Sequence, residues 1–170
     1  MAALLAAALL SLGGCGDDDP PPPPPSSSTP TSPSPTTSSP TSQAESAEEF
    51  IRRWVDEDIK MQNSGETVEF LAMTSKCGPC SKLAQAVNRF YAAGGYVKTQ
   101  GWEILSVERL PATAAGTRLM LVRVDGHPTE YRESSDGPVR RLPGGRTQFQ
   151  FTLIKSEQSW LVRDYVEVSS

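Results

Sequence analysis

Apolar residues recur at helical intervals in two stretches of the chain. The first begins at Ser46 and Glu49, which have the spacing of a capping box, and stops at the Asn-Ser-Gly of residues 63–65. The second covers residues 78–93, with Cys77 placed like an N-cap residue, and stops at two glycines. The apolar faces comprise Ala47, Phe50, Ile51, Trp54, Val55 and Ile59 in the first stretch and Cys80, Leu83, Ala84, Val87, Phe90 and Tyr91 in the second. This pattern predicts two amphipathic helices.

The segment between them, residues 66–74, fits two patterns. Val68, Phe70 and Ala72 alternate as they would in a strand. Val68, Leu71 and Ala72 also share one face of a helix. The pattern alone leaves both alternatives open, and the choice between them separates two folds.

After Gly95 the hydrophobic period becomes two. Strands are predicted at residues 102–110, 117–124, 129–133, 146–155 and 160–168, and turns at 111–116, 125–128, 135–138 and 156–159. The last two strands alternate so that one face of an antiparallel hairpin is buried, and residues 142–146 resemble a hairpin loop. Helices that precede a run of strands predict an α+β fold, with the helices on one face of a curved antiparallel sheet.

The N-terminus has a different character. Residues 1–14 carry no charge and are about as long as the apolar region of a signal peptide. Leu12-Gly13-Gly14-Cys15 resembles a bacterial lipobox, in which the cysteine receives diacylglycerol and becomes the new N-terminus. No Lys or Arg precedes Cys15, so we expect the true start codon upstream. The predictions are an export signal over 1–14 and a lipid anchor on Cys15.

Residues 15–43 form a predicted spacer. Three aspartates and six consecutive prolines are followed almost only by Ser, Thr and Pro. Residues 17–42 hold no aromatic or aliphatic side chain that could offset the entropy of ordering, so an extended, disordered segment is expected. The predicted organisation is therefore signal peptide 1–14, anchored spacer 15–43 and one domain over 44–170, held at the outer face of the cell membrane.

The charge of the chain argues against nucleic acid as a partner. The chain has 16 basic and 20 acidic residues, and three of the acidic ones lie in the spacer. The domain is thus nearly neutral, and its Arg52-Arg53 and Arg140-Arg141 pairs are interpreted as solvated surface. No nucleic-acid partner is expected.

Cys77-Gly78-Pro79-Cys80 supports two hypotheses. At a helix N-terminus this motif lowers the pKa of a thiol, and in a thioredoxin-like oxidoreductase Cys77 would be the nucleophile and Cys80 the resolving residue. Residues 110–113 could then supply a cis-proline loop. Against this stand Lys76, where such enzymes usually have Trp, the lack of helical periodicity after Gly95, and a C-terminal strand in place of a helix.

A structural disulfide between Cys77 and Cys80 is the favoured hypothesis. The chain-entropy estimate for so short a loop is about 2 kcal/mol. Metal binding by the pair would need further ligands, and the single histidine, His127, lies in a predicted exposed turn. No nucleophilic triad or phosphate-binding glycine loop is present, so no cofactor and no metal are expected. Trp54, Trp102 and Trp160 are predicted core anchors.

The order of elements, with a late Trp-bearing strand at residues 159–164, resembles the nuclear transport factor 2-like cone of SnoaL-type and ketosteroid-isomerase-type domains. More closely, the whole chain is similar to an uncharacterised family of actinobacterial lipoproteins. The shared features are the lipobox, the Ser/Thr/Pro spacer, the aromatic first helix, the Cys-x-x-Cys, and Tyr91-x-x-Gly94-Gly95. The resemblance implies three N-terminal helices on a curved sheet and a place at the envelope, and no reaction.

By analogy with enzymes of this fold, Asp125, Asp164, Tyr131 or Tyr165 could serve as acid or base. The sequence nevertheless favours a non-enzymatic binding or scaffolding module, tethered through Cys15, with a small-molecule or protein ligand at the mouth of the cone. The alternative is a membrane-tethered thiol-disulfide oxidoreductase.

Overall fold

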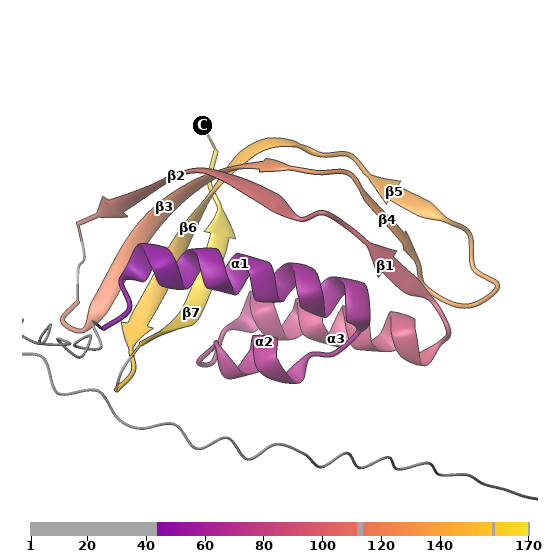
Figure 1. Cartoon of the computed structure of the whole chain (residues 1–170), viewed down its shortest axis with the longest axis horizontal. Coiled ribbons are helices and arrows are strands. Elements are labelled where there is room, and N and C mark those ends of the chain that lie inside the picture. Colours follow the sequence, from indigo (N-terminus) through magenta and orange to yellow (C-terminus); the bar gives the residue numbers. More distant parts are fainter. Residues whose placement is uncertain (1–43, 112–113, 158, 170) are drawn as a thin grey trace, which may run out of the picture. The chain divides into compact units, whose positions relative to one another are not determined.

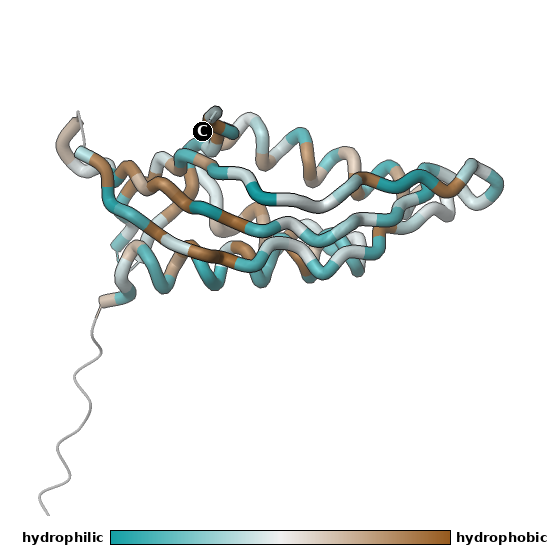
Figure 2. The backbone as a smooth tube through the Cα atoms, turned by 90° about the horizontal axis from the view of Figure 1, so that it is seen from above, coloured by the Kyte–Doolittle hydropathy of each residue, from teal (hydrophilic) through white to brown (hydrophobic). Residues whose placement is uncertain are grey.

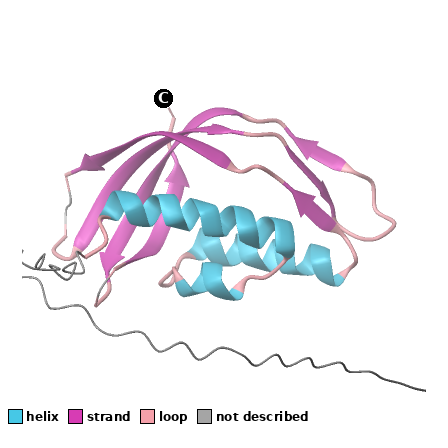
Figure 3. Cartoon of the chain, viewed as in Figure 1, coloured by secondary structure: helices cyan, strands magenta, loops and turns pink. Residues whose placement is uncertain are grey.

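Three helices precede seven strands in the computed structural model, which describes residues 44–111, 114–157 and 159–169 (Figures 1 and 3). The helices are α1 (Ala47–Ser64), α2 (Val68–Ala72) and α3 (Gly78–Ala92). The strands are β1 (Tyr96–Lys98), β2 (Trp102–Leu110), β3 (Thr117–Gly126), β4 (Thr129–Arg132), β5 (Arg140–Leu142), β6 (Gly145–Lys155) and β7 (Trp160–Glu167). The predicted signal peptide, Cys15 and the spacer lie outside the described residues.

Helix α1 begins and ends as predicted. Ser46 accepts a hydrogen bond from the backbone N–H of Glu49, and the Glu49 carboxylate accepts one from the N–H of Ser46, which completes a capping box. Gly65 adopts a left-handed conformation with a φ of 81° and caps the other end. None of the described helices combines the length and the hydrophobicity needed to cross a membrane.

The residues before Cys77 are helical. Val68–Ala72 form the short helix α2, so the alternative strand over 66–74 is wrong. Only an isolated bridge follows, in which Thr74 lies parallel to Val162 of β7. The described residues after Gly95 form strands and loops. This arrangement is the predicted α+β fold with helices on a curved antiparallel sheet, and it differs from a thioredoxin fold at the points that the sequence singled out.

The strands form two sheets, with orders β2-β3-β6-β7 and β1-β4-β5, and every pair within them is antiparallel. Strands β3 and β4 are consecutive parts of one bent strand, as are β5 and β6, because β3 pairs with β6 and β4 pairs with β5. The predicted turn at 125–128 and the predicted hairpin loop at 142–146 are therefore wrong. Both are bends, and the chain reverses between them, around residues 133–139.

A close backbone contact explains why a glycine lies at the second bend, because a Cβ atom on Gly144 would come within 2.1 Å of the Gly126 carbonyl oxygen. Gly101, in the loop between β1 and β2, is packed against α1, and a Cβ atom there would come within 2.1 Å of Cγ1 of Ile59. The backbone N–H of His127 donates to the Gly101 carbonyl at 2.9 Å and ties neighbouring bends together. The glycines at these bends are interpreted from the sequence as turn residues, but their role is to let two neighbouring strands approach closely. The chain does not reverse direction there.

The core lies between α1 and the concave face of the larger sheet. Trp54 is fully buried and its ring lies 5.2–5.4 Å from those of Phe70, Phe151 and Tyr165. Trp160 is also buried, and the half-buried Trp102 stacks on Phe149 at 4.5 Å. The prediction that the three tryptophans anchor the core is confirmed.

Candidate functional site

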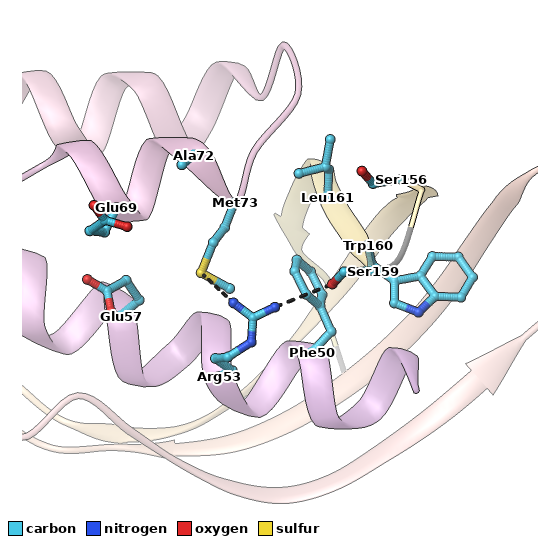
Figure 4. Close-up of a pocket in the computed structure, with 10 residues that line it drawn as sticks. All are labelled: Phe50, Arg53, Glu57, Glu69, Ala72, Met73, Ser156, Ser159, Trp160 and Leu161. Carbon is cyan, nitrogen blue, oxygen red and sulfur yellow. Dashed lines mark hydrogen bonds between the residues drawn. The ribbon is translucent and has the colours of Figure 1, made fainter. Parts of the chain in front are cut away.

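A groove of about 340 Å³ opens where α1 and α2 meet the β6–β7 hairpin (Figure 4). Its lining combines apolar side chains with a small number of charged and hydroxyl groups. The lining residues are Phe50, Arg53, Glu57, Glu69, Ala72, Met73, Ser156, Ser159, Trp160 and Leu161. This combination is typical of a site that orients a ligand through few polar contacts.

Arg53 is held in place at the centre of the groove. Its guanidinium donates two hydrogen bonds of 2.8 Å to the carboxylate of Glu45, and further ones to Sδ of Met73 at 3.5 Å and to Oγ of Ser159 at 3.4 Å. The bonds from Arg53 hold the pKa of Glu45 below its ordinary value, although partial burial opposes the shift. The carboxylate of Glu45 also accepts from Ser159, and its carbonyl accepts from the Trp160 indole at 3.1 Å. These hydrogen bonds fix the orientation of the Arg53 guanidinium.

Acidic side chains form another part of the lining. Glu57 on α1 and Glu69 on α2 face each other from the two helices (Figure 4). Glu57 pairs with Lys60 at 3.1 Å, one turn further along α1. Two carboxylates near an apolar floor form an environment that favours a cationic group on a ligand.

A second polar feature lies inside the core. Asp58 projects from the buried face of α1 and is only 2% exposed. Its Oδ2 accepts a hydrogen bond from Gln62 at 2.8 Å, whereas its Oδ1 has no partner, and neither has the indole N–H of Trp54. Burial raises the pKa of Asp58 to about 7, with the Gln62 bond acting in the opposite direction.

Tyr165 shares this interior. Burial raises the pKa of its phenol to about 12, and the nearby charge of Asp58 adds to the shift. Its ring lies among those of Trp54, Trp102, Phe149 and Phe151, at 5.4–6.4 Å. A carboxyl group with a pKa of about 7, such as that of Asp58, can donate or accept a proton near neutral pH, but Asp58 is buried away from solvent.

Asp58 is not among the residues predicted from the sequence, although the sequence carries a signal for it. The residue lies four positions after Trp54 and three before Met61, on the apolar stripe of the first helix. An acidic residue on such a stripe breaks the expected pattern. Asp58, rather than a residue of the strands, is therefore the buried acid of this fold.

Cys77 and Cys80 lie at disulfide distance across the first turn of α3, with 5.3 Å between their Cα atoms. Cys77 is the N-cap residue, and its Sγ accepts a hydrogen bond from the N–H of Cys80 at 3.2 Å. Both side chains are buried, at 1% and 0% exposure. The preceding residue, Lys76, has a φ of 54°, which is uncommon for a side chain of this size.

The other candidate acids and bases are dispersed. His127 is exposed at a bend and lines a polar hollow with Lys98. Asp125 pairs with Arg146 at 3.4 Å on the surface, and Tyr131 stacks on Phe90 at 5.7 Å. Asp164 is half-buried in β7 next to Tyr165, which alone among these candidates lies with Asp58 in the core. Among the described residues, no three His, Cys, Asp or Glu side chains gather as metal ligands.

No protein-family model matches the sequence, and no curated protein matches it. Solved structures with the same arrangement of elements exist. The intermembrane space region of the chloroplast protein ARC6 superimposes with a TM-score of 0.52 at 8% identity, over 73% of this chain and 95% of that one. This likeness shows the fold alone.

Two further structures resemble the chain less well. An uncharacterised protein with a cystatin-like fold from Caulobacter vibrioides gives a TM-score of 0.43 at 12% identity, over 72% of this chain and 89% of that one. A putative scytalone dehydratase from Novosphingobium aromaticivorans has the same score and identity, over 72% and 84%. The order of helices and bent strands is that of the nuclear transport factor 2-like cone.

The buried carboxyl group makes a prediction about stability. An unfolded Asp has a pKa of about 3.9, so between about pH 4 and pH 7 the folded state holds a proton on Asp58 that the unfolded state releases. The free energy of unfolding should therefore fall as the pH rises, by on the order of 4 kcal/mol for this residue over the whole window and by on the order of 2.5 kcal/mol between pH 5 and pH 8. Urea unfolding at pH 5 and pH 8 measures the difference, which Asp58→Asn should largely abolish.

The matched control is Asp56→Asn, which changes an exposed residue of the same helix. It should retain the pH dependence of the wild-type protein. Equal pH dependence in the Asp58→Asn variant and the wild type would contradict the assignment.

Proposed function

We propose that the chain is a lipid-anchored protein of the bacterial cell envelope whose domain binds a ligand without catalysing a reaction. The lipobox-like sequence ending in Cys15 and the Ser/Thr/Pro spacer support the anchor and a location at the outer face of the cell membrane. The resemblance to actinobacterial lipoproteins supports the same location. The Cys77–Cys80 pair adds to this, since disulfides persist mainly outside the cytoplasm.

The burial of the reactive side chains is the observation that supports a non-enzymatic function. Asp58 is 2% exposed, and Cys77 and Cys80 are 1% or less. A general acid or a nucleophile must reach its substrate, and a thiol also needs access to its partner. In our proposal the cysteine pair clips the entry to α3, and the buried aromatic cluster serves the stability of the cone.

The groove of Figure 4 is the proposed binding site and takes the place of the predicted cone mouth. Its apolar floor and the facing carboxylates of Glu57 and Glu69 favour a ligand with apolar groups next to a positive charge. Arg53 is paired with Glu45 and Glu57 with Lys60, whereas Glu69 forms no salt bridge within the described part of the chain. Glu69 is therefore the carboxylate of the groove that is left for a positive charge on the ligand. A short peptide segment that carries Lys beside aliphatic residues has this chemistry.

The anchor is tested by Cys15→Ala. Without the thiol no diacylglycerol can be attached, so the variant should appear in the medium or remain unprocessed, while the wild type partitions into detergent with the membranes. Ser39→Ala in the spacer is the control and should behave as the wild type. Unchanged membrane retention of Cys15→Ala would refute the anchor.

The binding site is tested with two peptides, one alternating Leu and Lys and one alternating Leu and Glu. Only the first should shift the amide NMR signals of Ala72, Met73 and Leu161, because its charges complement Glu57 and Glu69. Glu69→Lys should weaken that binding at least about fivefold, whereas Glu66→Lys, a charge reversal just before α2 and outside the groove lining, should not. Equal binding of both peptides would contradict the proposal that the groove selects a ligand with a positive charge.

The oxidoreductase is the second candidate, favoured by the hydrogen bond that Cys77 Sγ accepts at the N-terminus of α3. Because both sulfur atoms are buried, we expect no reduction of insulin with dithiothreitol as electron donor. The double variant Cys77→Ser, Cys80→Ser should instead lose at most about 2 kcal/mol of stability. Insulin reduction that Cys77→Ser abolishes would replace the binding module with the enzyme.

A further inference from the structure

Glu45 occupies a polar site at the edge of the proposed binding groove. It lies between the predicted spacer and Ser46, the N-cap residue of α1. Its carboxylate accepts two hydrogen bonds of 2.8 Å, from Nε and one terminal nitrogen of Arg53, and a third from the hydroxyl of Ser159. Two bonds from one guanidinium to both oxygens of a carboxylate are the geometry with which proteins recognise carboxylates. Arg53 and Ser159 therefore form a complete carboxylate site.

The site also contacts the backbone of Glu45. The carbonyl oxygen of this residue accepts a hydrogen bond of 3.1 Å from the indole N–H of Trp160, the first residue of β7. The donors come from distant parts of the sequence, since 106 positions separate Arg53 from Ser159. The tertiary structure thus assembles three donors around the carboxylate and the carbonyl of a single acidic residue, as a binding site for such a residue requires.

The same three donors line the groove (Figure 4). Arg53 donates a further hydrogen bond to Sδ of Met73, which also lines the groove. A ligand in the groove would therefore contact the guanidinium that Glu45 holds in the free protein. Glu45 and a carboxylate of the ligand compete for one set of donors.

The groove also offers the opposite charge. Arg53 and Glu57 lie one turn apart on α1, along which hydrophilic and hydrophobic residues alternate (Figure 2). Glu69 lines the groove from α2 and faces Glu57 (Figure 4). A ligand that satisfies both kinds of charge carries a carboxylate, apolar groups and a positive charge.

Glu45 fills the carboxylate site without closing it permanently. The side chain of Arg53 is 51% exposed and that of Glu45 is 23% exposed. Water screens an ion pair with such exposure, so the pair contributes little to the stability of the fold. Glu45 nevertheless belongs to the same chain, which gives it an effective concentration on the order of millimolar or higher at the site. A carboxylate alone therefore competes poorly, whereas a ligand that also contacts Glu69 and the apolar floor can displace Glu45.

We infer that Arg53 and Ser159 bind a carboxylate of the ligand, and that Glu45 fills their site in the free protein. This inference rests on the proposed groove and narrows its ligand to a peptide that combines an acidic residue with Lys and aliphatic residues. The contact of Trp160 with the Glu45 carbonyl favours a Glu side chain as the source of the carboxylate, because a Glu of the ligand presents the same two groups at the same spacing.

A blocked amino acid tests the site without a peptide. N-acetyl-glutamate amide has the carboxylate and the carbonyl of Glu45, and N-acetyl-glutamine amide lacks only the charge. In the full chain with Glu45→Ala, in detergent, the first compound at up to about 100 mM should shift the Trp160 indole and Arg53 Nε–H NMR signals saturably, and the second should not. The wild type and Glu48→Ala, at an exposed glutamate paired with Arg52, should need at least about fivefold higher concentrations. Equal responses of Glu45→Ala to both compounds, or none, would overturn the inference.

Blocked Leu/Lys peptides with a Glu or a Gln at one end test the ligand. A Glu at one of the two ends should strengthen binding to the full chain at least about fivefold relative to Gln at the same end. Arg53→Gln should remove this preference, whereas Arg52→Gln, at the neighbouring arginine outside the groove lining, should retain it. A Gln peptide with a free C-terminus that binds as tightly as the Glu peptide identifies a terminal carboxylate as a further source, and either source supports the site.

The carboxylate site and the preference of the groove for a cation can fail separately. Equal binding of the Glu and Gln peptides would overturn the inference and leave the cationic ligand in place. If no Leu/Lys peptide binds although N-acetyl-glutamate amide does, the carboxylate site stands and the proposed ligand chemistry is contradicted.

Discussion

The contact of Trp54 with the concave sheet is the interaction on which this fold depends. Its ring touches Phe70 of α2, Phe151 of β6 and Tyr165 of β7, and so joins helices and strands that are distant in the sequence. Burying a large aromatic side chain stabilises a domain by about 1.5–3 kcal/mol from its apolar area alone. Because the rings fill the interior, helix α1 cannot shift along the sheet without opening voids.

This packing also explains the state of Asp58. The carboxyl group sits four residues beyond Trp54 on the same face of α1, and it receives one hydrogen bond from Gln62. A charged carboxylate with so few partners is costly in a low-dielectric interior, and the protonated form is favoured instead. The raised pKa of Asp58 is therefore a consequence of the aromatic core around it.

The surface of the domain carries the proposed binding groove. The groove between α1, α2 and the β6–β7 hairpin has fixed charges, since Arg53 is held by Glu45 and Ser159. The buried cysteine pair begins α3 just before the residues that contact the core, where a covalent link limits movement of the helix. These features agree with the binding role that we propose for the domain.

The sequence by itself determined the local elements of this protein. The capping box at Ser46, the glycine stop at Gly65 and the N-cap at Cys77 are decided by contacts within a few residues, and they occur where the pattern predicted them. The period of two identified the long strands for the same reason. The segment over residues 66–74 stayed ambiguous because both periodicities fit it.

Only the tertiary structure decided how these elements combine. It made 68–72 a helix because Phe70 packs on Trp54, and it converted two apparent turns into bends because Gly144 lies against Gly126. It also buried Asp58, since burial depends on which neighbours cover a face. The physical reason is that local pattern records the period of each element, whereas sheet pairing and burial arise from contacts between residues far apart in the chain.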